Sequence, residues 1–446
     1  MRTRLLALLC LLSVAALPVA ARAATPSAEH WVVQIDLWGN ASVSELELSR
    51  DGKRLSGTLD GDVVEGSVDG KTFRIVETDK DQAVYRYVGT RSGDTLRGVA
   101  DFPDHNDPQR RVEHAFVATR VPDRPPGGPQ HHVFVPTEYS NEFSQHRKPV
   151  LTLWPGDSVR TTTIDSGGVD EHGVTRALYG NPQTGPFYVA TASPGDTLAV
   201  RITRLRLNRD NADSLDDIVG RAQTPRLAAR ATGLGQPVRW TLDRERGVAH
   251  PEHPSEHLKH FEVPLRPMLG GLAVAPGFGA APLSTGDTQR FGGNMDFNDI
   301  VEGNTVYLPV QQPGALLYLG DAHALQGDGE TSQYALETSM DVEFTVDVIR
   351  GREIAMPRVE SPTQIMVLGQ AGSLDDALRA ATAGMTQWLE QDYGLTLSEC
   401  AQVLGTSVHY EIENLAGRSV GVSAKLDKTR LAGLARVPSP SPSPTP

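Results

Sequence analysis

Apolar and polar residues alternate along residues 30–120, and turn signals interrupt the alternation at short intervals. The run "SVSELELSRDGKRLSGTLDGDVVEGSVDGKTFRIVE" reverses at Asp51-Gly52, Asp60-Gly61 and Asp69-Gly70. Asp-Gly pairs between alternating segments are the strongest local hairpin signal, because glycine accepts the positive φ that such turns require. The run "DQAVYRYVGTRSGDTLRGVAD" continues the pattern. We therefore predict a small antiparallel β-domain, a sheet or partial barrel, over residues 24–122.

A second β-rich region follows a Pro/Gly linker predicted at residues 123–130. The runs "PVLTLWPGDSVRTTTID" and "FYVATASPGDTLAVRITRLRL" share a Pro-Gly-Asp turn, which predicts two similar hairpins in one sheet system. The runs "TVYLPVQQPGALLYLGDAH" and "DVEFTVDVIRG" add further strands. The pattern predicts a mainly β fold, with a sandwich-like or barrel-like domain over residues 131–433.

Helix signals are confined to the C-terminal part of the chain. The run "SLDDALRAATAGMTQWLEQDYG" begins with Ser373 as the N-cap, has Asp376 at the capping-box position and ends at Gly394. Its 3.6-residue period predicts that one face carries Leu378, Ala381, Met385 and Leu389. The run "TLSECAQVLG" predicts a second, shorter helix, in which Cys400 is most simply a packed thiol.

The two ends of the chain have the composition of segments outside the fold. "MRTRLLALLCLLSVAALPVAARA" has a basic start, an apolar run and an A-x-A site, which predicts a Sec-type signal peptide over residues 1–23. Its apolar core leaves an uncleaved anchor as an alternative. No later stretch predicts a transmembrane anchor, so we expect a secreted or periplasmic protein. The Pro/Ser-rich residues 434–446 predict a disordered tail.

Charge and cysteine content narrow the range of partners. Removal of the predicted signal peptide takes Lys plus Arg from 42 to 39 and leaves Asp plus Glu at 55, so the charge changes from -13 to -16. Such an acidic chain argues against nucleic acid as a partner. The same removal leaves a single cysteine, which cannot form an internal disulfide. The sequence does not fix the oligomeric state and leaves a homo-oligomer open.

Two segments place acidic residues beside glycines: "RFGGNMDFNDIVEGNTVYLPV" and "GALLYLGDAHALQGDGETSQYALE". Cations are bound by carboxylate and imidazole ligands on backbone that can fold tightly around them. One histidine among carboxylates suits zinc or another first-row metal better than calcium. The candidate ligands are Asp296, Asp321, His323, Asp328, Glu330 and Glu337. The alternative is a set of solvated Asp-Gly turns.

A histidine-rich segment offers a second, weaker candidate metal site. "HPEHPSEHLKH" contains His253, His257 and His260, whose spacing would place them on one helix face. The prolines at 251 and 254 permit a helix only from about residue 254 onward. We interpret this segment as a polar surface loop.

Four segments together resemble the acetamidase/formamidase family of amidohydrolases: "NPQTGPFYVATASPGDTLAVRI", "VPLRPMLGGLAVAP", "FGGNMDFNDIVEGNTVYLPVQQPGALLYLGDAHALQGDGE" and "PRVESPTQIMVLG". The resemblance runs from about residue 131 to 433. It implies a β-rich fold, a metal-assisted site, and hydrolysis of short aliphatic amides to a carboxylate and ammonia.

The resemblance carries over to individual positions. It matches Gly292, Gly293, Asn294 and Asp296 to a GGN-x-D element, and it matches Asp321, His323, Gln326, Gly327, Asp328 and Glu330 to a GD-x-H-x-x-QGDGE element. Glu337 matches an acid after the following strand, and Asp165 matches an acid after the first Pro-Gly-Asp turn. The chain departs at Phe291, where similar proteins commonly carry histidine, and this departure puts the specificity or the strength of the activity in question.

These matches imply a mechanism. Asp296, His323 and a further carboxylate would hold a divalent cation, for which we favour zinc, and the cation would lower the pKa of bound water. Glu337 or Asp165 would transfer the proton, and Asn294 or backbone N–H groups would stabilise the oxyanion. Asp321 has the alternative of orienting His323. Asp328 and Glu330 have the alternative of holding their loop through backbone N–H groups.

The sequence therefore predicts an exported amidase whose partner is a small amide substrate. A serine-nucleophile mechanism is disfavoured, since the chain has no G-x-S-x-G motif. Two alternatives stay open. The same fold could hold a cation without catalysis, with Phe291 marking a lost activity, or the protein could hydrolyse a larger extracellular amide that the N-terminal domain helps to bind.

Overall fold

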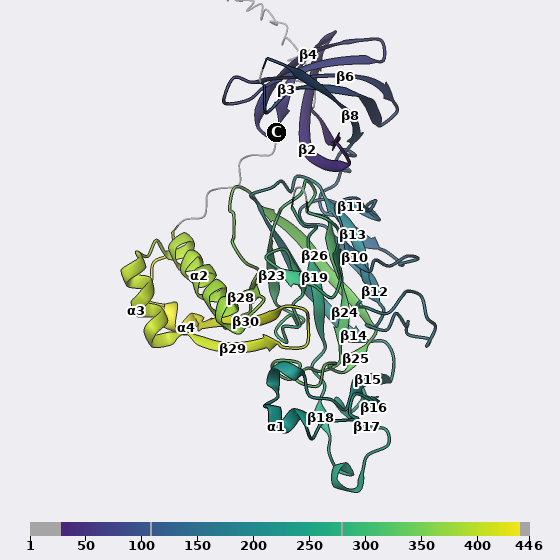
Figure 1. Cartoon of the computed structure of the whole chain (residues 1–446), viewed down its shortest axis with the longest axis vertical. Helices are drawn as coiled ribbons and strands as arrows, with labels where there is room; N and C mark the ends of the chain where they lie inside the picture. Colours follow the sequence, from purple (N-terminus) through teal and green to yellow (C-terminus); the bar gives the residue numbers. More distant parts are fainter. Residues whose placement is uncertain (1–27, 108, 278–279, 438–446) are drawn as a thin grey trace, which may run out of the picture.

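The computed structural model describes residues 28–107, 109–277 and 280–437. The predicted signal peptide, residues 1–23, and most of the predicted tail lie outside the described residues. The prediction of a mainly β fold with a few C-terminal helices is confirmed. The N-terminal strands form one body, and the remaining strands and helices form a larger body below it in Figure 1.

The N-terminal strands form a closed antiparallel barrel in which each strand pairs with its sequence neighbour and β1 pairs with β8. The sequence predicted the hairpins but only a sheet or partial barrel. Closure follows from inward-facing apolar residues on every strand, which pack into one core around Trp31 and Phe73. The strands are β1 (Glu29–Leu37), β2 (Asn40–Asp51), β3 (Arg54–Leu59), β4 (Asp62–Asp69), β5 (Thr72–Thr78), β6 (Val84–Ser92), β7 (Thr95–Pro103) and β8 (Arg111–Arg120).

The larger body consists mainly of two packed sheets with a continuous apolar core. The first sheet has the order β18-β17-β16-β15-β25-β24-β19-β22-β21, with β13 beside β24 and β11 beside β13. Its strands are β11 (Leu151–Leu153), β13 (Gln183–Val189), β15 (Asn211–Leu215), β16 (Pro237–Asp243), β17 (Val248–Pro251), β18 (Val263–Pro264), β19 (Met268–Ala273), β21 (Thr288–Gln289), β22 (Gly292–Asn294), β24 (Leu317–His323) and β25 (Glu337–Thr338).

The second sheet has the order β29-β30-β28-β27-β23-β14-β26-β12-β9. Its strands are β9 (His131–Val133), β12 (Ser158–Thr163), β14 (Thr197–Leu207), β23 (Thr305–Pro309), β26 (Met340–Ile349), β27 (Arg358–Glu360), β28 (Gln364–Ala371), β29 (His409–Asn414) and β30 (Val420–Asp427). Two further short strands, β10 (Glu142–Phe143) and β20 (Leu283–Ser284), pair with each other.

The two Pro-Gly-Asp turns do not form hairpins, so that prediction is wrong. β11 pairs in parallel with β13, whereas β12 pairs with β26 and β9, so the first turn carries the chain from one sheet to the other. The second turn does the same between β13 and β14. Every residue of β13 is buried. A strand covered on both faces lacks the alternation from which its pairing partner could be inferred.

Both predicted helices are confirmed. α2 (Leu374–Tyr393) begins after Ser373, whose side chain accepts the Asp376 N–H, and ends at Gly394 in the left-handed conformation. α3 (Leu397–Ser407) has a full capping box. The prediction that Leu378 shares the buried face of α2 is wrong, because this side chain is 39% exposed. The remaining helices are α1 (Pro225–Ala228), α4 (Lys428–Leu431) and two single 3-10 turns, Gly220–Ala222 and Glu256–Leu258.

Two further expectations can be compared with the described residues. The segment containing His253, His257 and His260 is exposed and includes a short 3-10 turn, as expected for a polar surface loop. None of the helices in the described part of the chain is long and apolar enough to cross a membrane.

Candidate metal centre

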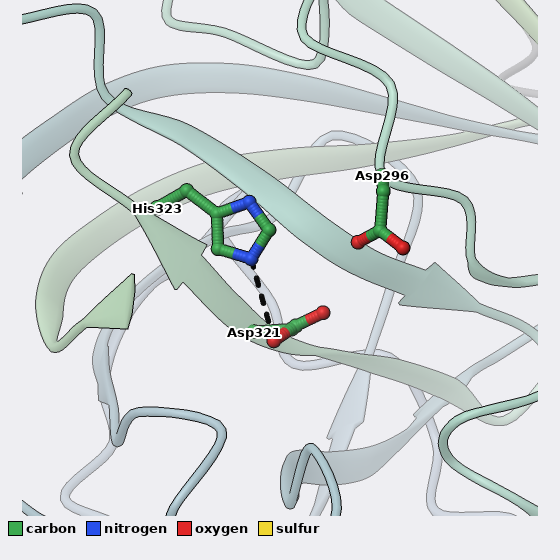
Figure 2. A group of neighbouring side chains, drawn as sticks. All are labelled: Asp296, Asp321 and His323. Atoms are coloured by element: carbon green, nitrogen blue, oxygen red, sulfur yellow. Dashed lines mark ion pairs between the residues drawn. The ribbon is translucent and has the colours of Figure 1, made fainter. Parts of the chain in front are cut away.

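Neighbouring strands of the first sheet bring the central residues together. Asp321 and His323 lie two residues apart at the end of β24, so their side chains lie on the same side of the strand. Glu337 begins β25 and pairs directly with His323. Asp296 follows β22, and Figure 2 shows its carboxylate directed toward Asp321 and His323. Glu330 lies in the loop between β24 and β25.

His323 is held with one ring nitrogen facing the carboxylates. Its Nε2 lies 3.2 Å from Glu337 Oε1 and 3.5 Å from Asp321 Oδ1. Its Nδ1 lies 3.0 Å from Gln326 Oε1, while the Gln326 amide nitrogen donates to the carbonyl of Asp296. Because Gln326 offers His323 an oxygen, Nδ1 carries the proton in the neutral ring and Nε2 presents a lone pair.

The donor set fits a divalent cation. Ligand atoms of Asp296, Asp321 and His323 lie within 4.8 Å of one another, and so do those of His323, Glu330 and Glu337. All five residues are buried. Four of their polar atoms have no hydrogen-bond partner among the described residues: Asp296 Oδ1, Asp321 Oδ1, His323 Nε2 and Glu337 Oε2. The two groups share His323. Buried polar atoms are costly without partners, and a cation would offset that cost for the atoms that it contacts. Imidazole with carboxylates is a donor set suited to zinc.

Burial and mutual repulsion shape the electrostatics of this cluster. Burial and the neighbouring acids raise the pKa values of Asp296 and Glu337 above their ordinary range, and they raise the pKa of Glu330 to about 8. Burial lowers the pKa of His323, but the carboxylates of Glu337 and Asp321 outweigh it and raise that pKa overall. The cluster therefore carries an excess of negative charge that protons or a cation must offset.

Three asparagine amides orient the aspartates. The Asn294 side chain donates to Asp296 Oδ2 at 2.6 Å, and Asn414, from the end of β29, donates to the same oxygen. Asn181 donates to Asp321 Oδ2 at 3.1 Å and also to Asn294 Oδ1. These donors occupy one oxygen of each aspartate and leave the other oxygen of each without a partner. The arrangement is typical of residues that surround and orient metal ligands.

The backbone of the cluster is constrained. The φ values are 46° at Asp296, 55° at Asp321 and 45° at Glu330, in the left-handed region that residues other than glycine rarely adopt. Such conformations cost of order 1–3 kcal/mol each and are concentrated at functional sites. Gly292 and Gly293 have φ values of 88° and 113°, and each lies against a backbone carbonyl where a Cβ would collide. The GGN-x-D element therefore needs both glycines.

Asp165 lies near the cluster but is already paired. Arg209 Nη2 donates to Asp165 Oδ2 at 2.7 Å, and both side chains are buried. The same Arg209 nitrogen donates to the carbonyl of Glu337 at 3.2 Å, and its Nε donates to Thr338. This buried pair connects Asp165 to the strand that carries Glu337, and it engages the carboxylate that sequence analysis offered for proton transfer.

Two predicted positions lie outside the cluster. Asp328 is exposed, and its carboxylate accepts a hydrogen bond from Asn298. Phe291 is 1% exposed and packs edge-on against Phe143 in the main core, with ring centroids 5.5 Å apart. Phe291 thus acts as a core side chain in this structure.

Partly exposed residues mark the side of the cluster nearest to solvent. Asn181 is half-buried and contacts both Asn294 and Asp321. Tyr179, exposed in the same loop, has its hydroxyl hydrogen-bonded to that of Tyr334. Tyr334 precedes Ala335, whose N–H donates to both Glu330 and Glu337. The two tyrosines therefore bridge two loops beside the cluster.

Several residues of this site could not be predicted from the sequence. Asn181 opens the quoted segment "NPQTGPF", and that segment was the only signal for it. Asn414 is 118 residues from Asp296 and Arg209 is 128 residues from Glu337, so spacing could not reveal them. Gly270, on β19, also went unnoticed: a Cβ there would lie 2.6 Å from Asp296 Oδ1 and 2.7 Å from Asp321 Oδ2.

Comparisons with known proteins point to one family. The model of the Acetamidase/Formamidase family matches residues 278–413. A provisionally named formamidase of Schizosaccharomyces pombe is 54% identical over 41 residues, 9% of this chain and 10% of that protein. An acetamidase of Mycolicibacterium smegmatis is 39% identical over 61 residues, 14% of this chain and 15% of that protein. The matched segments thus span less than a sixth of these curated relatives.

A solved structure extends the likeness to a whole chain. The acetamidase from Yersinia enterocolitica has a TM-score of 0.58 and 28% sequence identity, over 69% of this chain and 94% of that chain. The shared part is therefore almost all of that protein and about two thirds of this one.

Proposed function

The resemblance of this chain to the acetamidase/formamidase family is confirmed, and on that premise we propose that it hydrolyses short linear carboxamides to a carboxylate and ammonia. The observation that carries the proposal is that four unpartnered polar atoms, from Asp296, Asp321, His323 and Glu337, belong to two buried ligand groups that share His323. Buried carboxylate and imidazole atoms without a structural partner are characteristic of catalytic metal sites.

Asp296 Oδ1, Asp321 Oδ1, His323 Nε2 and Glu337 Oε2 would hold a divalent cation, for which the imidazole favours zinc over calcium. When bound, such a cation acts as a Lewis acid that lowers the pKa of water and polarises the amide carbonyl. Asn294, Asn414 and Asn181 orient the aspartates for this task.

Glu330 is the group we assign to proton transfer. Its carboxylate has a ligand atom within 4.8 Å of those of His323 and Glu337, and burial raises its pKa above the ordinary range, so that it can both accept and return a proton. It would accept the proton of the attacking water and deliver it to the amide nitrogen, because an amide anion is too poor a leaving group to depart unprotonated. The Ala335 N–H, 3.1 Å from Glu330 Oε1, holds the carboxylate in place.

The remaining predicted residues receive supporting roles. Asp165 is a positioning residue, since its pair with Arg209 anchors the backbone of Glu337. Asn294 positions Asp296, because its amide hydrogen bond is directed at that carboxylate. Asp328 lies in the same motif but outside the cluster, and so we give it no part in the reaction.

We also propose that the protein acts outside the cytoplasm, on the basis of the Sec-type signal peptide predicted over residues 1–23. An exported enzyme would meet extracellular amides larger than formamide. We therefore compare amide substrates of increasing size.

The test is ammonia release from formamide, acetamide, propionamide and butyramide by zinc-loaded and metal-stripped protein. We expect turnover that depends on metal. Glu330→Gln should keep the metal and lose about two to four orders of magnitude in kcat. Asp328→Asn, in the same motif but exposed, is the matched control and should retain activity.

Three outcomes separate the alternatives. Absence of ammonia from every amide, with one tightly held metal per chain, would favour a binding protein without catalysis and contradict the proposal. A rise in kcat/KM up to the largest amide would favour a larger substrate. Loss of activity in Asp328→Asn equal to that in Glu330→Gln would contradict the proton-transfer assignment.

A further inference from the structure

Two arginines are fully buried in the described part of the chain, and only one has a carboxylate partner. Arg209 is 7% exposed and pairs with Asp165. Arg358, on β27, is 3% exposed and makes no ion pair with any described residue. Its Nη2 donates to the amide oxygens of Gln387 and Gln391, at 3.1 and 3.0 Å, and its Nε has no hydrogen-bond partner in the described structure.

Arg358 lines a cavity of about 60 Å³ between the second sheet and α2. The cavity wall includes Arg352, Tyr307, Trp388 and Asp392, none of which belongs to the candidate metal centre. About 10–15 Å³ admits a single water, so this cavity has room for a ligand of several atoms. The guanidinium carbon of Arg358 lies 4.9 Å from the centre of the Trp388 ring, which fixes the cation in the wall.

The other charges at the cavity neutralise one another. Asp392 is paired with Arg352 and accepts the indole N–H of Trp388 at 3.1 Å. Glu360 is paired with Lys428 at 2.6 Å and also accepts the Tyr307 hydroxyl at 2.8 Å. Each acid therefore has its own cation, and Arg358 is left as one uncompensated positive charge.

The guanidinium of Arg358 stays charged under ordinary conditions. Burial and the nearby Arg352 lower the pKa of Arg358 to about 9, which is still above neutral pH. A buried charge without a counter-ion is strongly unfavourable, so the cavity should take up a monovalent anion from solution.

We propose that this cavity is a binding site for one small carboxylate, of the size of formate or acetate, held by Arg358. A carboxylate supplies acceptors for the free Nε and matches both the single residual charge and the cavity volume. The proposed amidase reaction releases a carboxylate of this class, but the inference depends on the cavity alone and holds whether or not the protein hydrolyses amides.

The experiment titrates the full-length mature protein with sodium formate, acetate, phosphate or chloride at constant ionic strength. The readouts are the thermal unfolding temperature and tryptophan fluorescence, to which Trp388 in the cavity wall contributes. We expect a saturable change with formate or acetate, with half-saturation roughly in the millimolar range expected for so few atoms. Phosphate, as a dianion, should bind at least tenfold more weakly, and chloride should give no saturable change.

Variants assign the effect to the cavity. Arg358→Met should abolish the saturable response, and Arg358→Lys should weaken it about tenfold, because lysine keeps the charge but loses the fork. Arg290→Met removes an exposed arginine whose one ion pair among the described residues is with Glu353, and it should respond like the natural protein. Trp388→Phe should lose the fluorescence change.

Several results would overturn the proposal. One is a response of the natural protein that follows ionic strength and is the same for all four salts. Another is a saturable response that persists in Arg358→Met. If Arg358→Met does not fold, the lysine variant and the comparison of salts on the natural protein still decide the question.

Discussion

Gly270 shows how a residue without chemistry of its own can determine a site. Its position on β19 faces the two aspartates, and a Cβ there would lie 2.6 Å from Asp296 Oδ1 and 2.7 Å from Asp321 Oδ2. Real carbon–oxygen contacts are not so short, so either carboxylate would have to leave its present position. Both oxygens belong to the aspartates that we assign to the cation.

Gly270→Ala should therefore lower metal affinity and ammonia release while leaving the fold intact. We expect a loss of kcat/KM of roughly 10–100-fold, since displacement of ligating or orienting groups commonly costs that much. Gly327→Ala is the control: it lies in the QGDGE motif, has ordinary φ and would meet no atom within 4 Å. Equal activity of the two variants would show that the aspartates do not need their present positions.

The sequence indicated the chemical groups of the site but not their arrangement. Asp296, Asp321 and His323 could be predicted as ligands from residue type, spacing and family resemblance. The left-handed backbone at Asp296, Asp321 and Glu330 could not, because tertiary contacts impose those φ values against local preference. The Arg209 pair, which engages Asp165, depends on contacts between distant segments that a linear pattern does not record.

At the scale of elements, local signals were read correctly and non-local pairings were not. The caps of α2 and α3 involve residues within one turn of the helix end, so the sequence predicts both helices. The Asp-Gly hairpins of the barrel are also local. The partners of β11 to β14 are set by which sheet each strand joins, and the fully buried β13 gives no alternation to indicate it.

The loop before β13 and the loop before β25 meet through Tyr179 and Tyr334, beside the candidate metal centre. If this tyrosine bridge limits the access of substrate to the candidate metal centre, Tyr179→Ala should raise kcat/KM for butyramide relative to formamide. We expect a rise of roughly tenfold or more, because a change of one methylene is worth 1–3 kcal/mol in a tight site. Leu178→Ala, also exposed in the same loop, should leave the ratio unchanged. An unchanged ratio in both variants would exclude a role in substrate size.

On the scale of the whole molecule, the barrel and the larger body have separate apolar cores. Figure 1 shows the barrel beyond one end of the sheets. Contacts between the two bodies among the described residues include Val32 of β1, which packs against the larger core, a hydrogen bond from Ser193 to Glu45, and Gln34 at 3.5 Å from His146. Bodies with separate cores and a limited polar interface commonly unfold independently. We expect two transitions in calorimetry.

Glu77 allows the barrel transition to be identified. Burial raises the pKa of Glu77 to about 7, with a contribution from nearby aspartates, and Tyr87 donates its hydroxyl to the carboxyl at 2.7 Å. The folded barrel binds this proton more tightly than the unfolded chain does. The resulting stabilisation is complete below about pH 4.5 and is lost as the pH rises through about 7; it amounts to at most about 3 kcal/mol.

One calorimetric transition should therefore move to lower temperature between pH 5 and pH 8. Glu77→Gln should remove most of that shift and leave the other transition unchanged. Glu65→Gln, on the adjacent strand and exposed, should behave like the natural protein. A single transition, or an equal pH dependence in Glu77→Gln, would contradict this account of the barrel.

The claim on which the functional account depends is that one buried cluster binds a divalent cation. The most direct measurement is anomalous X-ray diffraction at the zinc edge, on crystals of the zinc-loaded protein. We predict a single strong peak among Asp296, Asp321, His323 and Glu337, with a coordination position left for water. Absence of a peak there, or a peak only at the exposed His253, His257 and His260, would contradict the account.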